Sequence, residues 1–266
     1  MLDTSEQYIK ELSHTVINIY KLCIEEMGYD MGATKNKIDY HNYLLDDPIE
    51  FLEEFTEDEL STGDGDSSYT PSEVDSTVDF SNYKGGIISV DNLMKIYPKA
   101  KRNYAAAAVS ALDKYGSKVG LTDKGKLMVL AQFAHESGNF IYTHEIGSGK
   151  GRKYGVPTGP YGKAYYGRGP IQITWEVNYK KIAKEIFPKL GISADIHKDP
   201  DLCCSNLEIG CAASLAWFML PGNGKRAIAA ANAGDVKGLT KAINGGYNGL
   251  NDRIKNTKKI FSAVKG

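Results

Sequence analysis

The sequence of 266 residues predicts a mainly α-helical protein, in which an N-terminal helix and an acidic linker precede one larger domain. Two observations lead to this prediction. Apolar residues recur at three- and four-residue steps in several separate segments, which is the spacing of amphipathic and buried helices. Strict alternation of apolar and polar residues, which is typical of a half-buried strand, is scarce. We therefore expect little strand, with at most a small hairpin around residues 140–173.

Residues 1–30 are predicted to contain an amphipathic helix used for attachment or docking. Charged residues separate its apolar positions, so the segment has neither the pattern of a signal peptide nor the length of a membrane span. Its apolar stripe must be buried against the larger domain, a second copy of the chain or a partner. The stripe comprises Ile9, Leu12, Val16, Ile19, Tyr20 and Cys23.

Residues 31–86 are predicted to be an irregular acidic linker. No Lys or Arg occurs between Lys37 and Lys84, and residues 61–81 are rich in Ser, Thr, Gly and Asp. Such composition cannot bury enough apolar surface to fold alone. The pair Asp64 and Asp66 flanks a glycine but lacks the remaining ligands of a calcium loop, so we expect no metal there.

Caps and breakers place the helices of the larger domain, residues 87–266. Ser89 and Thr122 are expected to cap two of them. Gly125 weakens the first turn after Thr122, which predicts a later helix start. Pro188 is expected to stop a helix that begins at residue 177. The other helices are predicted at residues 103–115, 206–220, 235–243 and 253–264.

The helix predicted over residues 122–137 carries a candidate general acid, Glu136. Phe133 and Val129 precede it by three and seven residues, and the second half of the helix is apolar nearly all round. A buried carboxyl favours its neutral form, so we expect its pKa to be raised. A neutral carboxylic acid is the group that protonates a leaving oxygen. The alternative is a Glu that forms a buried structural pair with an Arg.

Glu145 follows nine residues later, in front of a glycine-rich stretch over residues 147–155. We expect a loop here, on which the carboxylate would be solvated and ionised. Two carboxyl groups in environments that push their pKa values apart are typical of an acid and base pair. The alternative is that Glu145 is an ordinary surface residue.

Four motifs extend this hypothesis: His135-Glu-Ser-Gly138, the block Tyr-Tyr-Gly-Arg-Gly-Pro-Ile-Gln-Ile-Thr-Trp over 165–175, Ala242-Ile-Asn-Gly-Gly246, and Asp252-Arg253. Together they resemble the family 19 glycoside hydrolases, which are chitinases and related phage and bacterial endolysins. The resemblance runs from about Ile87 to the C-terminus. It implies a helical, lysozyme-like domain and hydrolysis of N-acetylated amino sugar polymers with inversion. Inversion needs space for a water, so the two carboxyl groups should lie roughly 6.5–9.5 Å apart.

The resemblance also implies roles for single residues. Glu136 would be the acid and Glu145 the base, and the Thr174 hydroxyl would help the base to hold the attacking water. Arg253 would support the acid. From residue type alone, Trp175 is expected in the core. The remaining residues expected to bind the glycan or line the cleft are Tyr166, Gln172, Asn178, Asn244 and His135.

Several classes of site are not expected. Cys23, Cys203, Cys204 and Cys211 lack a histidine pair at ligand spacing, so we predict reduced thiols packed in a helical core and no metal. Zinc-finger spacings and arginine-rich runs are absent, which argues against nucleic acid as a partner. No cofactor motif occurs, and no stretch approaches the length of a stable membrane insertion.

These observations predict a peptidoglycan-degrading glycosidase, either a phage endolysin or a virion-associated lysin. The segment after residue 84 is basic, which suits an anionic cell-wall polymer. Residues 1–86 would bind a virion or tail protein. We expect the protein in the host cytoplasm before release, or in the virion, and acting on the cell wall. Two alternatives stay open: a chitinase, and an inactive structural or wall-binding virion protein.

Overall fold

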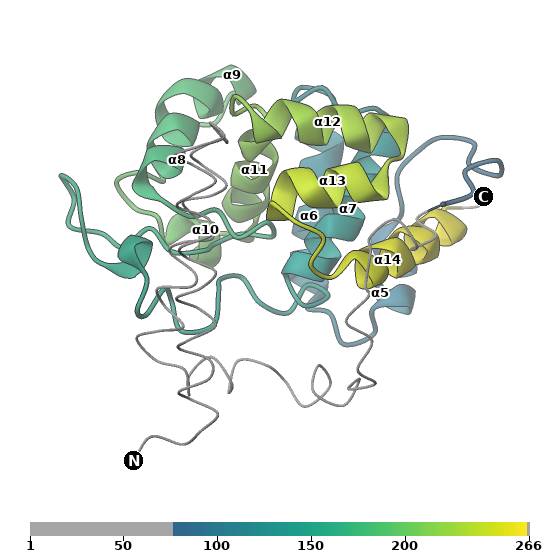
Figure 1. Cartoon of the computed structure of the whole chain (residues 1–266), viewed down its shortest axis with the longest axis horizontal. Helices are drawn as coiled ribbons and strands as arrows, with labels where there is room; N and C mark the ends of the chain where they lie inside the picture. The colour runs from purple at the N-terminus through teal and green to yellow at the C-terminus, as the bar shows by residue number, and fades with distance from the viewer. Residues whose placement is uncertain (1–76, 265–266) are drawn as a thin grey trace, which may run out of the picture. The chain divides into compact units, whose positions relative to one another are not determined.

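The computed structural model describes residues 77–264, so the predicted N-terminal helix and most of the predicted linker lie outside the described residues. The described part is mainly α-helical, as the sequence predicts, and contains no regular strand (Figure 1). The hairpin expected around 140–173 is reduced to three isolated bridges, which join His144 to Arg168, Thr158 to Lys163 and Arg168 to Ile173.

The end of the predicted linker is part of the folded domain. Val78 is buried. The rings of Phe80 and Tyr83 pack edge-on against Phe261, with centroids 4.7 and 5.3 Å away. The packed domain therefore begins before Ile87, because these apolar side chains continue its core.

Three helices follow, α5 (Val90–Ile96), α6 (Arg102–Tyr115) and α7 (Asp123–Glu136). Ser89 and Thr122 cap α5 and α7, as predicted, and each side chain accepts a backbone N–H from its own first turn. The later start expected for α7 is wrong. Gly125 lies in the first turn of α7, where it leaves room for the side chain of Asn232. The Oδ1 atom of Asn232 accepts the Thr122 N–H, and a Cβ at Gly125 would be only 2.2 Å from that oxygen.

A short 3₁₀ turn, η1 (Lys153–Gly155), precedes a broken helical segment made of α8 (Glu176–Lys181), the π-helical η2 (Ile182–Ile186) and α9 (Phe187–Leu190). The helix end predicted at Pro188 is wrong. Pro188 lies in the first turn of α9, a position where proline is tolerated because the backbone N–H it lacks is not needed for a hydrogen bond within that helix. Gly191, in the left-handed conformation, ends α9 instead.

The C-terminal half contains α10 (Leu202–Ser205), α11 (Leu207–Trp217), α12 (Asn223–Ala233), α13 (Val236–Asn244) and α14 (Leu250–Ala263). The predicted segments correspond to α11, α13 and α14, whereas α10 and α12 were not expected. α12 begins at Asn223-Gly224, which reads as a turn. Gly224 is needed there because a Cβ would lie 2.5 Å from the Phe218 carbonyl oxygen.

Helix α7 lies at the centre of the core, among α6, α12 and α14 (Figure 1). Every residue from Gly125 to Ala134 is buried, which confirms the apolar surroundings predicted for this helix. Cys203 and Cys211 are free and buried, and burial raises the pKa of both thiols, so they stay neutral. Among the described residues, no helix is both long and apolar enough to cross a bilayer.

Candidate active site

The candidate acid lies at the last residue of α7 and is bound by an arginine from α14. Nη2 of Arg253 donates to Oε1 of Glu136 at 2.6 Å, and Nη1 donates to Oε1 of Gln132, one turn earlier in α7. The Arg253 Nε donates to the Asn248 carbonyl oxygen at 3.1 Å. The Arg253 side chain is 1% exposed, whereas the Glu136 side chain is 17% exposed. The acid therefore has one edge against a buried cation and another open to solvent.

This arrangement corrects one expectation about Glu136. The helix around it is apolar and buried, as predicted, but the carboxyl group contacts a guanidinium rather than a wholly apolar pocket. The pairing with an Arg that was the alternative interpretation is present. Because Arg253 is buried, it contacts Glu136 and Gln132 rather than solvent, and the supporting role expected for it stays a prediction.

The candidate base, Glu145, lies on irregular chain and is held mainly by the backbone of Gly167. The Gly167 N–H donates to Oε1 at 2.7 Å, and the Glu145 N–H donates to the Gly167 carbonyl oxygen at 2.9 Å. The Tyr154 hydroxyl donates to Oε2 at 3.1 Å. Glu145 is half-buried. These two donors fix the orientation of the carboxyl group, which a general base requires.

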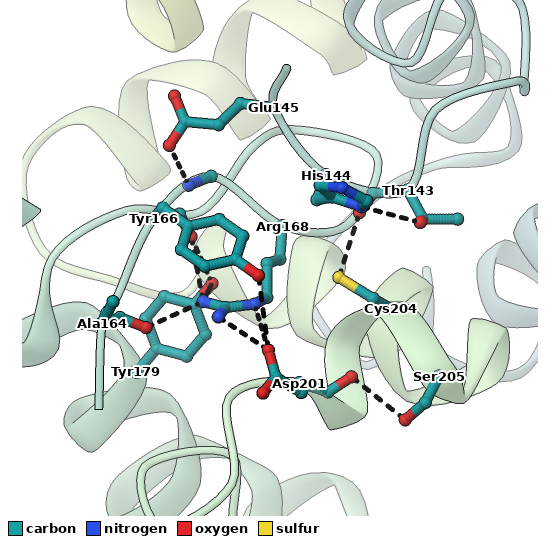
Figure 2. Close-up of polar contacts among 11 residues, drawn as sticks. Thr143, His144, Glu145, Ala164, Tyr166, Arg168, Tyr179, Asp201, Cys204 and Ser205 are labelled. Atoms are coloured by element: carbon teal, nitrogen blue, oxygen red, sulfur yellow. Dashed lines mark hydrogen bonds and ion pairs between the residues drawn. The ribbon is translucent and has the colours of Figure 1, made fainter. Parts of the chain in front are cut away.

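The segment that carries Gly167 is anchored by a buried arginine (Figure 2). The Arg168 side chain is 2% exposed and donates to Oδ1 of Asp201 from Nη2 at 2.7 Å and from Nε at 3.1 Å. Its Nη1 donates to the carbonyl oxygen of Ala164 at 3.1 Å. Backbone bonds from Gly169 to Thr143 and between Arg168 and Ile173 complete the support. An irregular segment is thereby held rigidly without a sheet.

Gln172 is brought beside the base. A Cβ at Gly167 would meet both Oε1 of Gln172, at 2.8 Å, and Cβ of Glu145, at 3.3 Å, so the three residues are neighbours. The Gln172 Nε2 donates to the Gly169 carbonyl oxygen at 3.1 Å. Its Oε1 is buried and lacks a partner among the described residues. Because this oxygen is buried, the glycan-binding role expected for Gln172 stays a prediction.

Thr174 and Asn178 lie together at the start of α8. Both are half-buried, and Nδ2 of Asn178 donates to the Thr174 carbonyl oxygen at 2.9 Å. One amide donor of Asn178 is thus used within the protein, where it fixes the backbone that carries the Thr174 hydroxyl. The roles expected for both residues stay predictions, as does the distance between the two candidate carboxyl groups.

His135 precedes the acid in α7, and Asn244 ends α13. Nδ1 of His135 is 2.7 Å from Oδ2 of Asp252, which links α7 to α14 a second time, next to Glu136. The His135 ring also packs on Gly249, where a Cβ would be 2.2 Å from it. Asn244, the last residue of α13, is exposed. His135 thus has a structural partner in addition to the role in the cleft expected for it.

Two aromatic residues differ from what the sequence suggests. The ring of Tyr166 lies over the Arg168 guanidinium, 3.4 Å from centroid to Cζ, so it covers the anchor rather than projecting freely toward a glycan. Trp175 is 38% exposed, and Tyr154 packs edge-on against it at 5.3 Å, so the expectation of a core residue is wrong. An exposed indole beside the partner of the base suits stacking on a sugar ring.

Tyr154 and Asp201 were not identified from the sequence. Tyr154 follows a glycine-rich stretch, and a Cβ at Gly155 would lie within 1.8 Å of the Gly149 carbonyl oxygen. Such close contact requires glycine at this position, so the Gly149 and Gly155 pair was a usable signal that the loop folds back on itself. The N–H of Gly167 has no signature in sequence.

Comparison with known proteins adds an independent line of evidence. Residues 127–246 match the family model described as chitinase class I. An endochitinase of Arabidopsis thaliana is 38% identical over 117 residues, which cover 42% of this chain and 38% of that protein. Endochitinase B of Zea mays is 34% identical over 155 residues, covering 53% of this chain and 48% of its own length. The chain thus spans less than half of these two plant relatives.

A solved structure described as a bacterial family 19 chitinase covers 67% of this chain and 95% of its own, with a TM-score of 0.48 and 23% identity. The segment matched by the family model contains Glu136, Glu145 and the whole block 165–175. Arg253 lies beyond its end. Three of the four motifs that suggested the resemblance therefore lie in the part of the chain that the family model matches.

Proposed function

We propose that this chain, whose residues 127–246 match the family model described as chitinase class I, hydrolyses a chitin-type glycan, a polymer of N-acetylglucosamine, with inversion at the anomeric carbon. The observation that supports this proposal best is the different fixation of two carboxyl groups within the matched segment. Glu136 is paired with a buried guanidinium, and Glu145 accepts two neutral hydrogen bonds.

In this mechanism Glu136 gives its proton to the oxygen of the bond that breaks. The carboxylate left behind is stabilised by the ion pair with Arg253 that the structure shows, so this contact favours the transition state, in which negative charge develops on Glu136, over the protonated ground state. Glu145 takes a proton from water, and that water attacks the anomeric carbon from the opposite face of the ring. The Thr174 hydroxyl would hold the same water.

The glycan would be bound by neutral polar groups and an exposed aromatic ring. The exposed residue Asn244 would hydrogen-bond an N-acetyl group or a hydroxyl. The exposed face of Trp175 would stack on a pyranose ring. The other large hydrophobic side chains exposed in the described part also fall between residues 142 and 177 of the sequence, and comprise Tyr142, Ile146, Val156, Tyr161 and Val177.

The choice of polymer rests on the relatives. The plant relatives named above are chitinases, which favours chitin over the peptidoglycan expected from the sequence. A phage endolysin or a virion-associated lysin finds no support among them. Peptidoglycan stays the second candidate for one reason: Lys and Arg outnumber Asp and Glu in residues 77–264, and such a surface is attracted to an anionic wall polymer.

The test is to incubate the protein, and the Glu136→Gln and Glu145→Gln variants, with chitin oligosaccharides and with purified sacculi side by side. We expect the unsubstituted protein to cleave the oligosaccharides and to release α-anomers first, as seen by NMR. Each variant should fold normally and lose roughly 10²–10⁴-fold in kcat. Release of β-anomers, or full activity of Glu136→Gln, would refute the mechanism. If the protein digests sacculi and leaves the chitin oligosaccharides intact, peptidoglycan replaces chitin as the proposed substrate.

A further inference from the structure

The candidate base is oriented through one peptide group, the group between Tyr166 and Gly167. Its N–H, from Gly167, donates to Oε1 of Glu145 at 2.7 Å. Its carbonyl, from Tyr166, accepts the Tyr179 hydroxyl at 2.8 Å. A trans peptide group is planar, and its C=O and N–H point in opposite directions. Holding the carbonyl on one side therefore fixes the direction of the N–H on the other.

Tyr179 is well suited to hold this carbonyl. It lies in α8, is fully buried, and its ring packs against Tyr165 with centroids 5.3 Å apart. Burial raises the pKa of its hydroxyl well above the ordinary value, so the group keeps its proton and remains a donor. Because no part of the side chain is exposed, it cannot touch a glycan.

A second donor reaches the same carbonyl from Arg168 (Figure 2). Nη1 of Arg168 is 3.3 Å from the Tyr166 oxygen and 3.4 Å from the Tyr179 hydroxyl. The guanidinium is itself held by Asp201. The shorter and more direct bond is that from Tyr179, and removing it leaves the peptide group with the longer one alone.

We propose that Tyr179 is a positioning residue for Glu145, which it orients through the plane of the Tyr166–Gly167 peptide group. The inference rests on the proposed function, in which Glu145 takes a proton from the attacking water. If the peptide group rotates, the N–H turns away from Oε1 and the carboxylate loses the donor that sets its position. The chemical step then slows, while binding of the glycan is unchanged.

The test compares Tyr179→Phe with a matched control, Tyr165→Phe. Both tyrosines are buried, and each hydroxyl donates to a backbone carbonyl at 2.8 Å, Tyr165 to that of His197. We expect similar losses of thermal stability in the two variants. On a fluorogenic chitin oligosaccharide, Tyr179→Phe should lower kcat about tenfold with KM within about twofold, because a small misplacement of a catalytic group is costly. Tyr165→Phe should keep the kcat of the unsubstituted protein.

A double-mutant cycle with Glu145→Gln separates positioning from general damage. If Tyr179 acts through the base, Tyr179→Phe should cost no further activity once Glu145→Gln is present. An equal loss in both backgrounds would overturn the proposal, as would an unchanged kcat in Tyr179→Phe alone. A protein whose activity is insensitive to Glu145→Gln would instead refute the proposed function, so the two failures are distinct.

Discussion

The two candidate catalytic residues are held by different kinds of contact, so the site has an acid side around Glu136 and a base side around Glu145. On the acid side, two regular helices meet through charged side chains: Arg253 of α14 binds Glu136 of α7, and Asp252 binds His135. On the base side, irregular chain meets irregular chain, and the groups that touch Glu145 are a backbone N–H and a tyrosine hydroxyl. The acid side should therefore respond to changes of charge, whereas the base side should respond to changes of shape.

The largest effect is expected from Arg253→Met. This change removes a fully buried guanidinium and leaves Glu136, Gln132 and the Asn248 carbonyl without their donor. Removing one partner of a buried pair costs about 3–5 kcal/mol, because the remaining charge is uncompensated. Urea unfolding monitored by circular dichroism measures the loss.

Two further variants show whether charge is the cause. Adding Glu136→Gln to Arg253→Met should restore part of the stability, since no unpaired carboxylate remains. Arg102→Met breaks an ion pair with Asp91 whose side chains are 63% and 73% exposed, and should cost far less stability than Arg253→Met, because solvent screens the exposed pair. If the double variant is no more stable than Arg253→Met, then lost packing rather than charge holds the acid side together.

Gly167→Ala is the corresponding change on the base side. The backbone of Gly167 is outside the left-handed region, so alanine fits its conformation, but its Cβ would crowd Gln172 and Glu145. We expect a kcat about tenfold lower, since displacement of a catalytic group by a fraction of an ångström slows the reaction. Hydrolysis of chitin oligosaccharides measures it.

Gly246→Ala is a suitable control for this change. Gly246 also lies outside the left-handed region, and the nearest atom to its Cβ, Oδ1 of Asn244, would be 3.7 Å away, which is ordinary contact. It should leave both folding and kcat unaltered. An unchanged kcat in Gly167→Ala would mean that the base tolerates movement, and the contrast between the two sides would then be lost.

The same contrast explains which parts were predictable from sequence. The acid side follows from local rules: Thr122 caps α7, the apolar pattern buries it, and Ser137 and Gly138 follow the end that carries Glu136. The identity of its partner does not follow from local rules, because Arg253 lies 117 residues further along the chain. Only the resemblance to a family placed the two together.

The base side was less predictable for a physical reason. The glycine-rich composition correctly indicated a loop at Glu145, but Gly167 contributes backbone atoms, which every residue has. Tyr179 and Arg168 donate to the Tyr166 carbonyl oxygen of the same peptide group, and no sequence pattern indicates these contacts. The periodicity of α8 reveals only that Tyr179 is buried. Trp175 was assigned to the core because indoles usually are buried, whereas here the side chain remains exposed.

The smallest effect is expected from Asp252→Asn and concerns pH. The hydrogen bond from His135 lowers the pKa of the Asp252 carboxyl below its ordinary value. The pair therefore stabilises the fold above pH ~4, the unfolded value, and this stabilisation is lost as the pH falls through the lower folded value. The Asp252 side chain is 51% exposed, so solvent screens the pair and its contribution is a few tenths of a kcal/mol.

The measurement is the free energy of unfolding of both proteins between pH 7 and pH 3. The unsubstituted protein should be slightly more stable than Asp252→Asn near neutral pH, and the difference should vanish at the acidic end. High salt should reduce the difference, whereas the loss of kcat in Gly167→Ala should be independent of salt, because no charge changes there. A pH-independent difference would mean that asparagine disturbs α14 sterically, and that charge at Asp252 does not link the two helices beside the acid.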